Sequence, residues 1–131
     1  MGALALDASV AIGLLDTADA HHQRARAALS ENRTLSLLMA VSAYSEALVR
    51  PLARGRGDAV ENFVEILRVE IVSADRDIGR RAAELRARRR SLRLPDALVL
   101  ATAQMRQVPL LSFDAGVMRV ARELELAPAQ S

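Results

Sequence analysis

The chain has 131 residues, a length typical of one domain, and 51% of them are hydrophobic, so a buried core can form. It contains no Cys, which excludes disulfides and thiolate metal sites and is compatible with a reducing compartment. The net charge is +2 but uneven, because segment 76–93 holds eight Arg against two acids, a net +6, and the remainder therefore carries −4.

No apolar run reaches the roughly 20 residues that a membrane-spanning helix needs. The amino terminus lacks the basic and apolar regions of a signal peptide. Met1 and Gly2 open the chain, but Leu6 stands where N-myristoylation requires Ser or Thr. We therefore expect a soluble, cytoplasmic protein.

Short apolar runs alternate with segments of helical periodicity along the chain. The expected strands are 3–6, 34–39, 69–72 and 108–111, and the expected helices are 10–15, 19–29, 42–50, 58–67, 76–90, 95–107 and 114–124. The expected N-terminal caps are Ser42, Asp58 in a variant capping box with Glu61, either Ser73 or Asp75, and Asp114. Pro51 is expected near a helix end and Pro95 at a first helical position.

The alternation of strands and helices is typical of an α/β fold around a mostly parallel sheet. The strand at 3–6 is apolar throughout, as expected when helices cover both faces of a sheet. We expect one α/β domain over 1–131, with a central sheet of four to five strands flanked by helices and a frayed tail from about residue 127.

Two acids follow strands at opposite ends of the chain. Asp7 comes directly after the first expected strand, and Asp114 comes three residues after the last apolar residue of the final one. In open parallel sheets, ligands bind at the carboxyl ends of the strands. We therefore expect Asp7 and Asp114 to lie at the same edge of the sheet.

Two further acids stand alone in apolar surroundings. Asp96 is the only charged residue within 94–105, a segment that is apolar nearly all round and is therefore expected to be buried. A carboxylate in such a helix is costly unless it is paired or bound to metal. Glu46 is the only charged residue between positions 33 and 50. Spacing alone does not give the direction in which either side chain points.

Taken singly, each acid is better explained by ordinary helix chemistry, as a cap or as a partner of the helix dipole. Taken together, four isolated acids favour a shared site. Two carboxylates about 4 Å apart repel by roughly 4 kcal/mol at an effective dielectric of 20, so a cation must lie among them or one must be protonated. Oxygen ligands without Cys suit Mg²⁺ or Mn²⁺, which bind phosphate oxygens and activate water.

Adjacent histidines at His21 and His22 offer a rival metal site. Neighbouring helical residues point about 100° apart and rarely ligate one ion together. A packing or surface role is therefore favoured for both.

Four segments carry a resemblance to a known family. They are Leu6-Asp7-Ala8-Ser9, Ser42-Ala-Tyr-Ser-Glu46, Leu94-Pro-Asp96-Ala-Leu-Val-Leu-Ala-Thr-Ala and Leu111-Ser-Phe-Asp114. With this order and spacing, essentially the whole chain resembles the PIN-domain ribonuclease toxins of bacterial VapBC toxin–antitoxin systems. The resemblance implies a metal-dependent endoribonuclease, the toxin of a type II system, that hydrolyses RNA phosphodiesters with Mg²⁺ or Mn²⁺. It also implies a cognate antitoxin as partner and a homodimer.

The resemblance implies that four acids are both catalytic residues and metal ligands: Asp7, Glu46, Asp96 and Asp114. Ser9 matches a small hydroxyl residue that supports the first acid, and Ser112 stands where the family often has Thr. Some members carry a further acid just after the fourth one. This chain has Ala115, Gly116 and Val117 there, which leaves the number of metal ions open.

The basic segment offers possible contacts to RNA or antitoxin. These residues are Arg80, Arg81, Arg86, Arg88, Arg89, Arg90 and Arg93. Arginines there could bind RNA phosphates, contact an acidic antitoxin segment, or form a solvated helix face whose stems cover apolar surface. The sequence leaves these three interpretations open.

The absence of Lys argues against receiver domains and aspartate-nucleophile phosphatases, which normally place a Lys beside the phosphoryl group. It also excludes a P-loop, and no Gly-rich turn follows the first strand, as a dinucleotide site would require. The remaining alternative is a non-catalytic PIN-like domain that binds RNA or a protein.

Overall fold

The computed structural model describes residues 2–129; Met1, Gln130 and Ser131 lie outside the described residues, and with them the end of the expected frayed tail. The strands are β1 Ala3–Leu6, β2 Ser36–Ala40, β3 Glu70–Val72 and β4 Leu110–Leu111. The helices are α1 Ala8–Leu15, α2 His22–Glu31, α3 Val41–Ala53, α4 Gly57–Ile66, α5 Arg76–Arg88, α6 Leu94–Arg106 and α7 Ala115–Glu123. None of the helices in the described range is long and apolar enough to cross a membrane.

The strands form one sheet in the order β3-β2-β1-β4, and each neighbouring pair is parallel. The register places Ala5 beside Leu38 of β2 and Leu6 beside Leu111 of β4. Parallel neighbours need long crossovers, which the helices between the strands supply. The predicted α/β fold with a mostly parallel sheet of four to five strands is confirmed.

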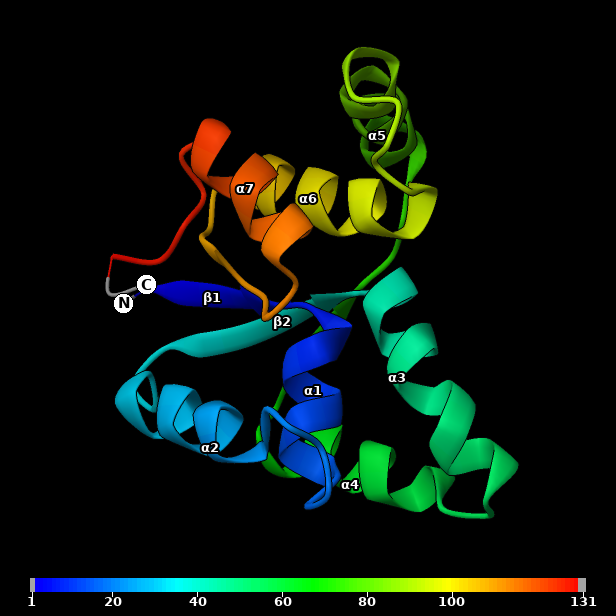
Figure 1. The fold of residues 1–131 in the computed structure, drawn as a ribbon, viewed down its shortest axis with the longest axis vertical. Coiled ribbons are helices and arrows are strands. Elements are labelled where there is room, and N and C mark those ends of the chain that lie inside the picture. Colours follow the sequence, from blue (N-terminus) through cyan, green and yellow to red (C-terminus); the bar gives the residue numbers. More distant parts are fainter. Residues whose placement is uncertain (1, 130–131) are drawn as a thin grey trace.

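Helices cover both faces of the sheet (Figure 1). In this view α6 and α7 lie above the strands with α5 beyond α6, whereas α1, α2 and α4 lie below them, and α3 leaves from the end of β2. Leu4 and Leu6 on one face of β1 and Ala5 on the other are at most 3% exposed. This burial on both faces explains why β1 is apolar throughout instead of alternating.

Helix α6 is the central covering helix. It contacts α3, α5, α7 and β2, and its buried residues run almost continuously from Ala97 to Ala103. The predicted burial of this apolar segment is confirmed. Leu94 takes the first helical position and Pro95 the second, where its missing N–H group costs no helical hydrogen bond. Asp96 therefore lies in the first turn of a helix that is otherwise buried in the core.

Two predicted caps are wrong. Helix α3 begins at Val41 with Ala40 as its cap, so Ser42 lies inside the helix and its buried Oγ has no hydrogen-bond partner among the described atoms. Helix α4 already begins at Gly57, so Asp58 lies in its first turn and caps nothing. In both cases the helix begins before the polar residue, because β2 runs directly into α3 and the loop before α4 is short.

Other predicted helix boundaries moved for local reasons. Helix α2 begins at His22 and not near residue 19, because Asp19 Oδ2 accepts a hydrogen bond of 2.9 Å from the His21 N–H group and holds these residues in a turn. Asp75, not Ser73, caps α5 by accepting from the Ile78 N–H group at 2.9 Å. Pro51 lies in the last turn of α3, which continues to Ala53.

Candidate active site

Asp7 is the buried acid at the end of β1, with 4% of its surface exposed. Its Oδ1 accepts a hydrogen bond of 2.9 Å from the Ala8 N–H group, which caps α1. Its Oδ2 accepts from the Ser112 hydroxyl at 2.7 Å and lies 3.4 Å from Ser9 Oγ. Both oxygens of this carboxylate are therefore held in place before any ligand arrives.

Ser9 and Ser112 connect the ends of two neighbouring strands. Ser9 Oγ accepts from the Phe113 N–H group at 2.9 Å, and Ser112 Oγ accepts from the Asp114 N–H group at 3.0 Å. The two hydroxyl oxygens are 3.4 Å apart. Because β1 and β4 are parallel neighbours, residues just past their ends meet here. The two serines thus hold Asp7 and the start of the segment that carries Asp114.

Asp114 is the exposed acid at the start of α7. Its Oδ1 accepts from the Val117 N–H group at 3.0 Å, so it is a helix cap as well as a member of the site. A Cβ atom added at Gly116 would lie 3.2 Å from the same oxygen. Gly116 therefore leaves this carboxylate uncrowded.

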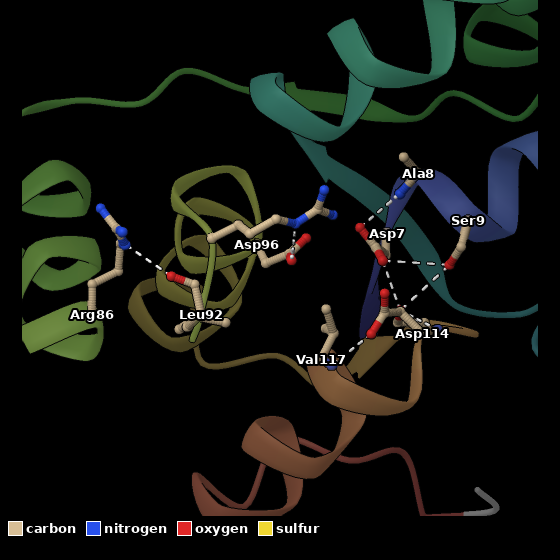
Figure 2. A network of polar contacts seen from close by, with 10 residues as sticks. Asp7, Ala8, Ser9, Arg86, Leu92, Asp96, Asp114 and Val117 are labelled. Atoms are coloured by element: carbon tan, nitrogen blue, oxygen red, sulfur yellow. Dashed lines mark hydrogen bonds and ion pairs between the residues drawn. The ribbon is translucent and has the colours of Figure 1, made fainter. Parts of the chain in front are cut away.

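Asp96 lies in the first turn of α6, with 14% of its side chain exposed, and forms an ion pair with Arg93. The distance from Arg93 Nε to Asp96 Oδ2 is 3.3 Å. Figure 2 shows the Asp96 carboxylate between the connection that carries Leu92 and the pair formed by Asp7 and Asp114. This arrangement gives the nearly buried carboxylate a counter-charge.

Glu46 is exposed and lies in the second turn of α3. Desolvation by the surrounding protein raises the pKa of Glu46, and the charges of the other three acids raise it further, while Arg93 opposes the rise. Since Glu46 is exposed to solvent, the charges of Asp7, Asp96 and Asp114 are the more informative cause of its raised pKa. Its carboxyl group therefore lies in the field of all three other acids.

Burial also raises the pKa of Asp7, and the charge of Asp96 adds to the rise. The hydrogen bonds from Ser112 and the Ala8 N–H group oppose it without cancelling it. Four elements thus bring the four predicted acids to one edge of the sheet, where they repel each other. This repulsion is the condition that a bound cation relieves.

Within residues 2–129, no group of three or more His, Cys, Asp or Glu side chains is close enough together to hold a metal ion. Asp96 faces Arg93, and Asp7 and Asp114 are held by their capping bonds. The donor set nonetheless fits a hard divalent cation in its chemistry, because it consists of carboxylate and hydroxyl oxygens with excess negative charge. Completing a ligand shell would require Asp96 to turn from Arg93, whereas Asp7 and Asp114 could keep their orientation.

A cavity of about 350 Å³ adjoins the acids, between the α5–α6 connection and α7. Asp96 and Asp114 line it together with Arg89, Arg93 and Arg119. Arg119 was missed in the sequence because it lies outside the basic segment. No pattern in the sequence marks it, because only the fold brings Arg119 into the cavity that Arg89 and Arg93 line.

The predicted arginine contacts separate into different local roles. Arg80 and Arg81 pair with Glu84 at 3.7 and 3.2 Å on the exposed face of α5. Arg86 Nε donates to the Leu92 carbonyl oxygen at 2.8 Å and so shapes the α5–α6 connection (Figure 2).

Arg89 pairs with Glu123 at 2.9 Å, which ties that connection to α7. No ion pair to Arg88 or Arg90 is found in the described part of the chain, and both are exposed. These two remain available for an outside partner.

The histidines pack, as predicted. His22 Nδ1 lies 2.8 Å from the Gly13 carbonyl oxygen, and the His21 ring lies 5.2 Å from the Phe113 ring. The Arg24 guanidinium covers the same Phe113 ring at 4.5 Å. These contacts anchor α2 to α1 and to the segment before Asp114.

Comparisons with known proteins agree with this fold. The family model described as "PIN domain" matches residues 4–123. The structure of VapC20 from Mycobacterium tuberculosis, a toxin that cleaves the sarcin-ricin loop, matches with a TM-score of 0.75 and 18% identity over 90% of this chain and 95% of that one. A toxin–antitoxin complex from Klebsiella pneumoniae matches with a TM-score of 0.69 and 23% identity over 86% of this chain and 87% of that one. No curated protein matches the sequence.

At these identities the two structures support the fold alone. The family match spans almost every element described above, from β1 to the end of α7. It includes the four strands, the acids at their carboxyl edge and both serines. The chain therefore belongs to the PIN-domain family.

Proposed function

We propose that this protein is a metal-dependent endoribonuclease and the toxin of a type II toxin–antitoxin pair. The observation that carries the proposal is the convergence of four acids from four elements at one sheet edge of a PIN domain: Asp7, Glu46, Asp96 and Asp114. VapC20, which shares the fold, is a toxin that cleaves the sarcin-ricin loop.

The proposed cofactor is Mg²⁺ or Mn²⁺, held by the four acids. When bound, such an ion polarises a phosphate oxygen and lowers the pKa of water for attack on phosphorus. The chain's own contribution is orientation: Ser9 and Ser112 fix the Asp7 carboxylate, and the Val117 N–H group fixes Asp114. Ligands held in this way need little reorganisation on binding.

The proposed substrate is RNA, whose phosphates would lie against the cavity lined by Arg89, Arg93 and Arg119. Arg88, which precedes Arg89 at the end of α5, is exposed. Replacing Arg88 and Arg89 together with alanine is expected to weaken RNA binding and to flatten its dependence on salt. An unchanged salt slope would assign these arginines to the fold or to a protein partner.

The proposed partner is a cognate antitoxin, and a homodimer is proposed from the family resemblance alone. The Klebsiella pneumoniae relative in fold is a toxin–antitoxin complex. Helices α3 and α4 expose Val49, Leu52 and Ile66 to 64, 61 and 76%. Large exposed apolar side chains on these two contacting helices offer a surface for a protein partner.

One observation favours a second candidate, a non-catalytic RNA- or protein-binding PIN domain. In the described residues no three candidate ligands are close enough to hold a metal, and Asp96 is occupied by Arg93. A binding module would keep these contacts in solution and would lose nothing when metal is removed.

The experiment that separates the two is cleavage of a mixed cellular RNA pool by the purified protein with Mg²⁺ or Mn²⁺ and with EDTA. Asp96→Asn is compared with Asp77→Asn, which removes the same charge from an exposed position on α5. Cleavage that needs metal, persists in Asp77→Asn and is lost in Asp96→Asn would support the nuclease. Absence of cleavage by the folded parent protein, with RNA binding retained, would favour the binding module.

A further inference from the structure

Arg93 occupies a position that ordinary helix chemistry does not favour. It is the N-cap residue of α6 and makes no side-chain capping bond. N-caps are usually Ser, Thr, Asp or Asn, and a positive charge at a helix N-terminus opposes the helix dipole. A cation at this position is therefore destabilising unless nearby negative charge offsets it.

The offsetting charge is the candidate metal site. The Arg93 side chain is 67% exposed, yet it turns to Asp96, whose side chain is 14% exposed. Asp96, and to a lesser degree Glu46 and Asp114, raise the pKa of Arg93, and Arg93 in turn opposes the rise in the pKa of Glu46. Among residues 2–129, Arg93 forms the only ion pair to any of the four acids.

We infer that Arg93 is a tethered counter-cation that competes with the divalent metal ion for Asp96 and turns to a phosphate of the RNA backbone once the metal is bound. The inference rests on the proposed carboxylate–metal function. It gives Arg93 two roles: it holds Asp96 when metal is absent, and it contacts a substrate phosphate when metal is present.

The ion pair is weak enough to be exchanged. Its contact is made through Nε at 3.3 Å, and most of the Arg93 side chain is exposed to solvent. Exposed pairs of this kind shift an equilibrium by roughly two- to fivefold, which a divalent cation bound by several carboxylates would readily overcome. Arg93 engages Asp96, and among the described residues no closed group of three metal ligands is found.

The released side chain has a place to act. Arg93 lines the same cavity as Arg89 and Arg119, beside Asp96 and Asp114. Arg89 is already paired with Glu123, so its charge is partly neutralised. A guanidinium presents a planar set of donors that matches phosphate oxygens. A phosphate next to the bound metal would therefore meet Arg93 at the rim of this cavity.

The first measurement is Mn²⁺ binding by titration calorimetry to the metal-free parent, Arg93→Gln, Asp96→Asn and Arg33→Gln. Arg33 is an exposed arginine before β2, at the opposite edge of the sheet, so its replacement matches the change in net charge. We expect Arg93→Gln to bind Mn²⁺ roughly two- to fivefold more tightly than the parent, because a competing cation is gone. The gain should shrink at high salt, which screens an exposed charge.

Arg93→Lys tests whether charge or shape is responsible. A lysine keeps the positive charge, so we expect the Mn²⁺ affinity to return towards the parental value. Arg33→Gln should bind Mn²⁺ like the parent. Circular dichroism of each variant verifies that the fold is retained.

The second measurement follows a single-stranded DNA oligonucleotide by fluorescence anisotropy, as a probe that carries backbone phosphates. Mn²⁺ should strengthen DNA binding in the parent and should do so less in Arg93→Gln, because only the parent releases an arginine to the phosphate. Tighter metal binding together with weaker phosphate binding is a combination that a merely structural residue would not produce.

The outcomes are distinct. If Arg93→Gln binds Mn²⁺ as weakly as the parent or more weakly, Arg93 only holds Asp96 in place, and the inference is overturned while the metal site stands. If the parent and Asp96→Asn bind Mn²⁺ equally, or neither binds it, the metal site itself fails and the inference fails with it. If metal affinity rises but the effect of Mn²⁺ on DNA binding is unchanged, the proposed contact to phosphate is refuted.

Discussion

Replacing Ser112 with alanine removes the hydroxyl that joins the two ends of the site. The buried Asp7 Oδ2 loses its bond of 2.7 Å and keeps only the contact of 3.4 Å to Ser9. The Asp114 N–H group loses its acceptor at 3.0 Å. Ser112 is itself 2% exposed, so water cannot easily replace the missing oxygen.

The size of the effect follows from these contacts. A hydrogen bond to a charged group contributes about 1.5–3 kcal/mol, and a buried donor left without a partner adds to the loss. We therefore expect Ser112→Ala to lower the free energy of unfolding by about 2 kcal/mol at neutral pH. In a chain of this size the melting temperature should fall by roughly 6–10 °C. Differential scanning calorimetry and urea unfolding measure both quantities.

The pH dependence provides an independent check. The Ser112 bond opposes the larger effect of burial on the pKa of Asp7, so removing the bond raises this pKa further. The extra stability that the bond gives the parent is therefore complete above the folded pKa of the variant and is lost as the pH falls through the folded pKa of the parent. The difference between Ser112→Ala and the parent should therefore shrink towards pH 4.

Ser30→Ala on the exposed face of α2 is the matched control and should change stability by less than about 0.5 kcal/mol. A Ser112→Ala protein as stable as this control would refute the role assigned to the hydroxyl.

Three further predictions concern the same site and the fold. Burial raises the pKa of Asp7, so the folded state favours the protonated carboxyl group. The contribution of Asp7 to the free energy of unfolding is therefore complete below its unfolded pKa and is lost as the pH rises through its folded pKa. Without metal, Asp7→Asn should therefore be more stable than the parent at pH 7, by roughly 1 kcal/mol, and lose this advantage near pH 4, as pH-dependent urea unfolding would reveal. Mn²⁺ at 100 times its Kd should stabilise the parent by about 2.7 kcal/mol and should stabilise Asp7→Asn much less. A melting temperature that Mn²⁺ does not change in either protein would argue against the site. Asp75→Ala removes the cap of α5 and should cost about 1 kcal/mol in chemical unfolding, independent of metal.

The buried position of Asp7 carries a cost in stability. Its carboxylate is 4% exposed, and Asp96 adds repulsion that the hydrogen bonds do not fully offset. A fold selected for stability alone would favour a neutral residue there. Retaining an acid at this position is consistent with a functional requirement for its charge. The gain in the free energy of unfolding predicted for Asp7→Asn would measure what this requirement costs in stability.

The strand-end acids could be placed from the sequence because a simple rule governs them. Apolar runs predicted β1 and β4, and in a parallel sheet their carboxyl ends share an edge, so Asp7 and Asp114 were expected to meet. The link through Ser9 and Ser112 follows from the same geometry. Local sequence patterns are enough to place a residue at a strand end, because the sheet topology determines the edge at which that strand ends.

Glu46 and Asp96 could not be placed in this way. Both lie in helices, and the direction of a helix residue depends on how the helix packs against the sheet, which no local pattern gives. The ion pair of Asp96 with Arg93 depends on the rotamers of two side chains. The apolar sequence around Glu46 and Asp96 indicates that these acids are unusual, but it does not indicate which side chains they contact.

Helix starts were the weakest part of the prediction. Ser42 and Asp58 have the chemistry of caps, but β2 passes directly into α3 and α4 begins at Gly57, so tertiary packing overrode local preference. Arg119 went unnoticed because its neighbours in the cavity come from a segment some 30 residues earlier in the chain, as the distance from Arg89 indicates. Proximity of this kind arises only from the packed fold.

The most direct test of the account is the position of Mn²⁺ in crystals of the protein, located by anomalous diffraction. The account predicts a peak at the carboxyl edge of the sheet, about 2 Å from carboxylate oxygens of Asp7 and of at least one other acid of the four. It also predicts that Asp96 has turned from Arg93 towards the ion. A peak elsewhere, or none at Mn²⁺ concentrations that support cleavage, would contradict the proposed carboxylate–metal site.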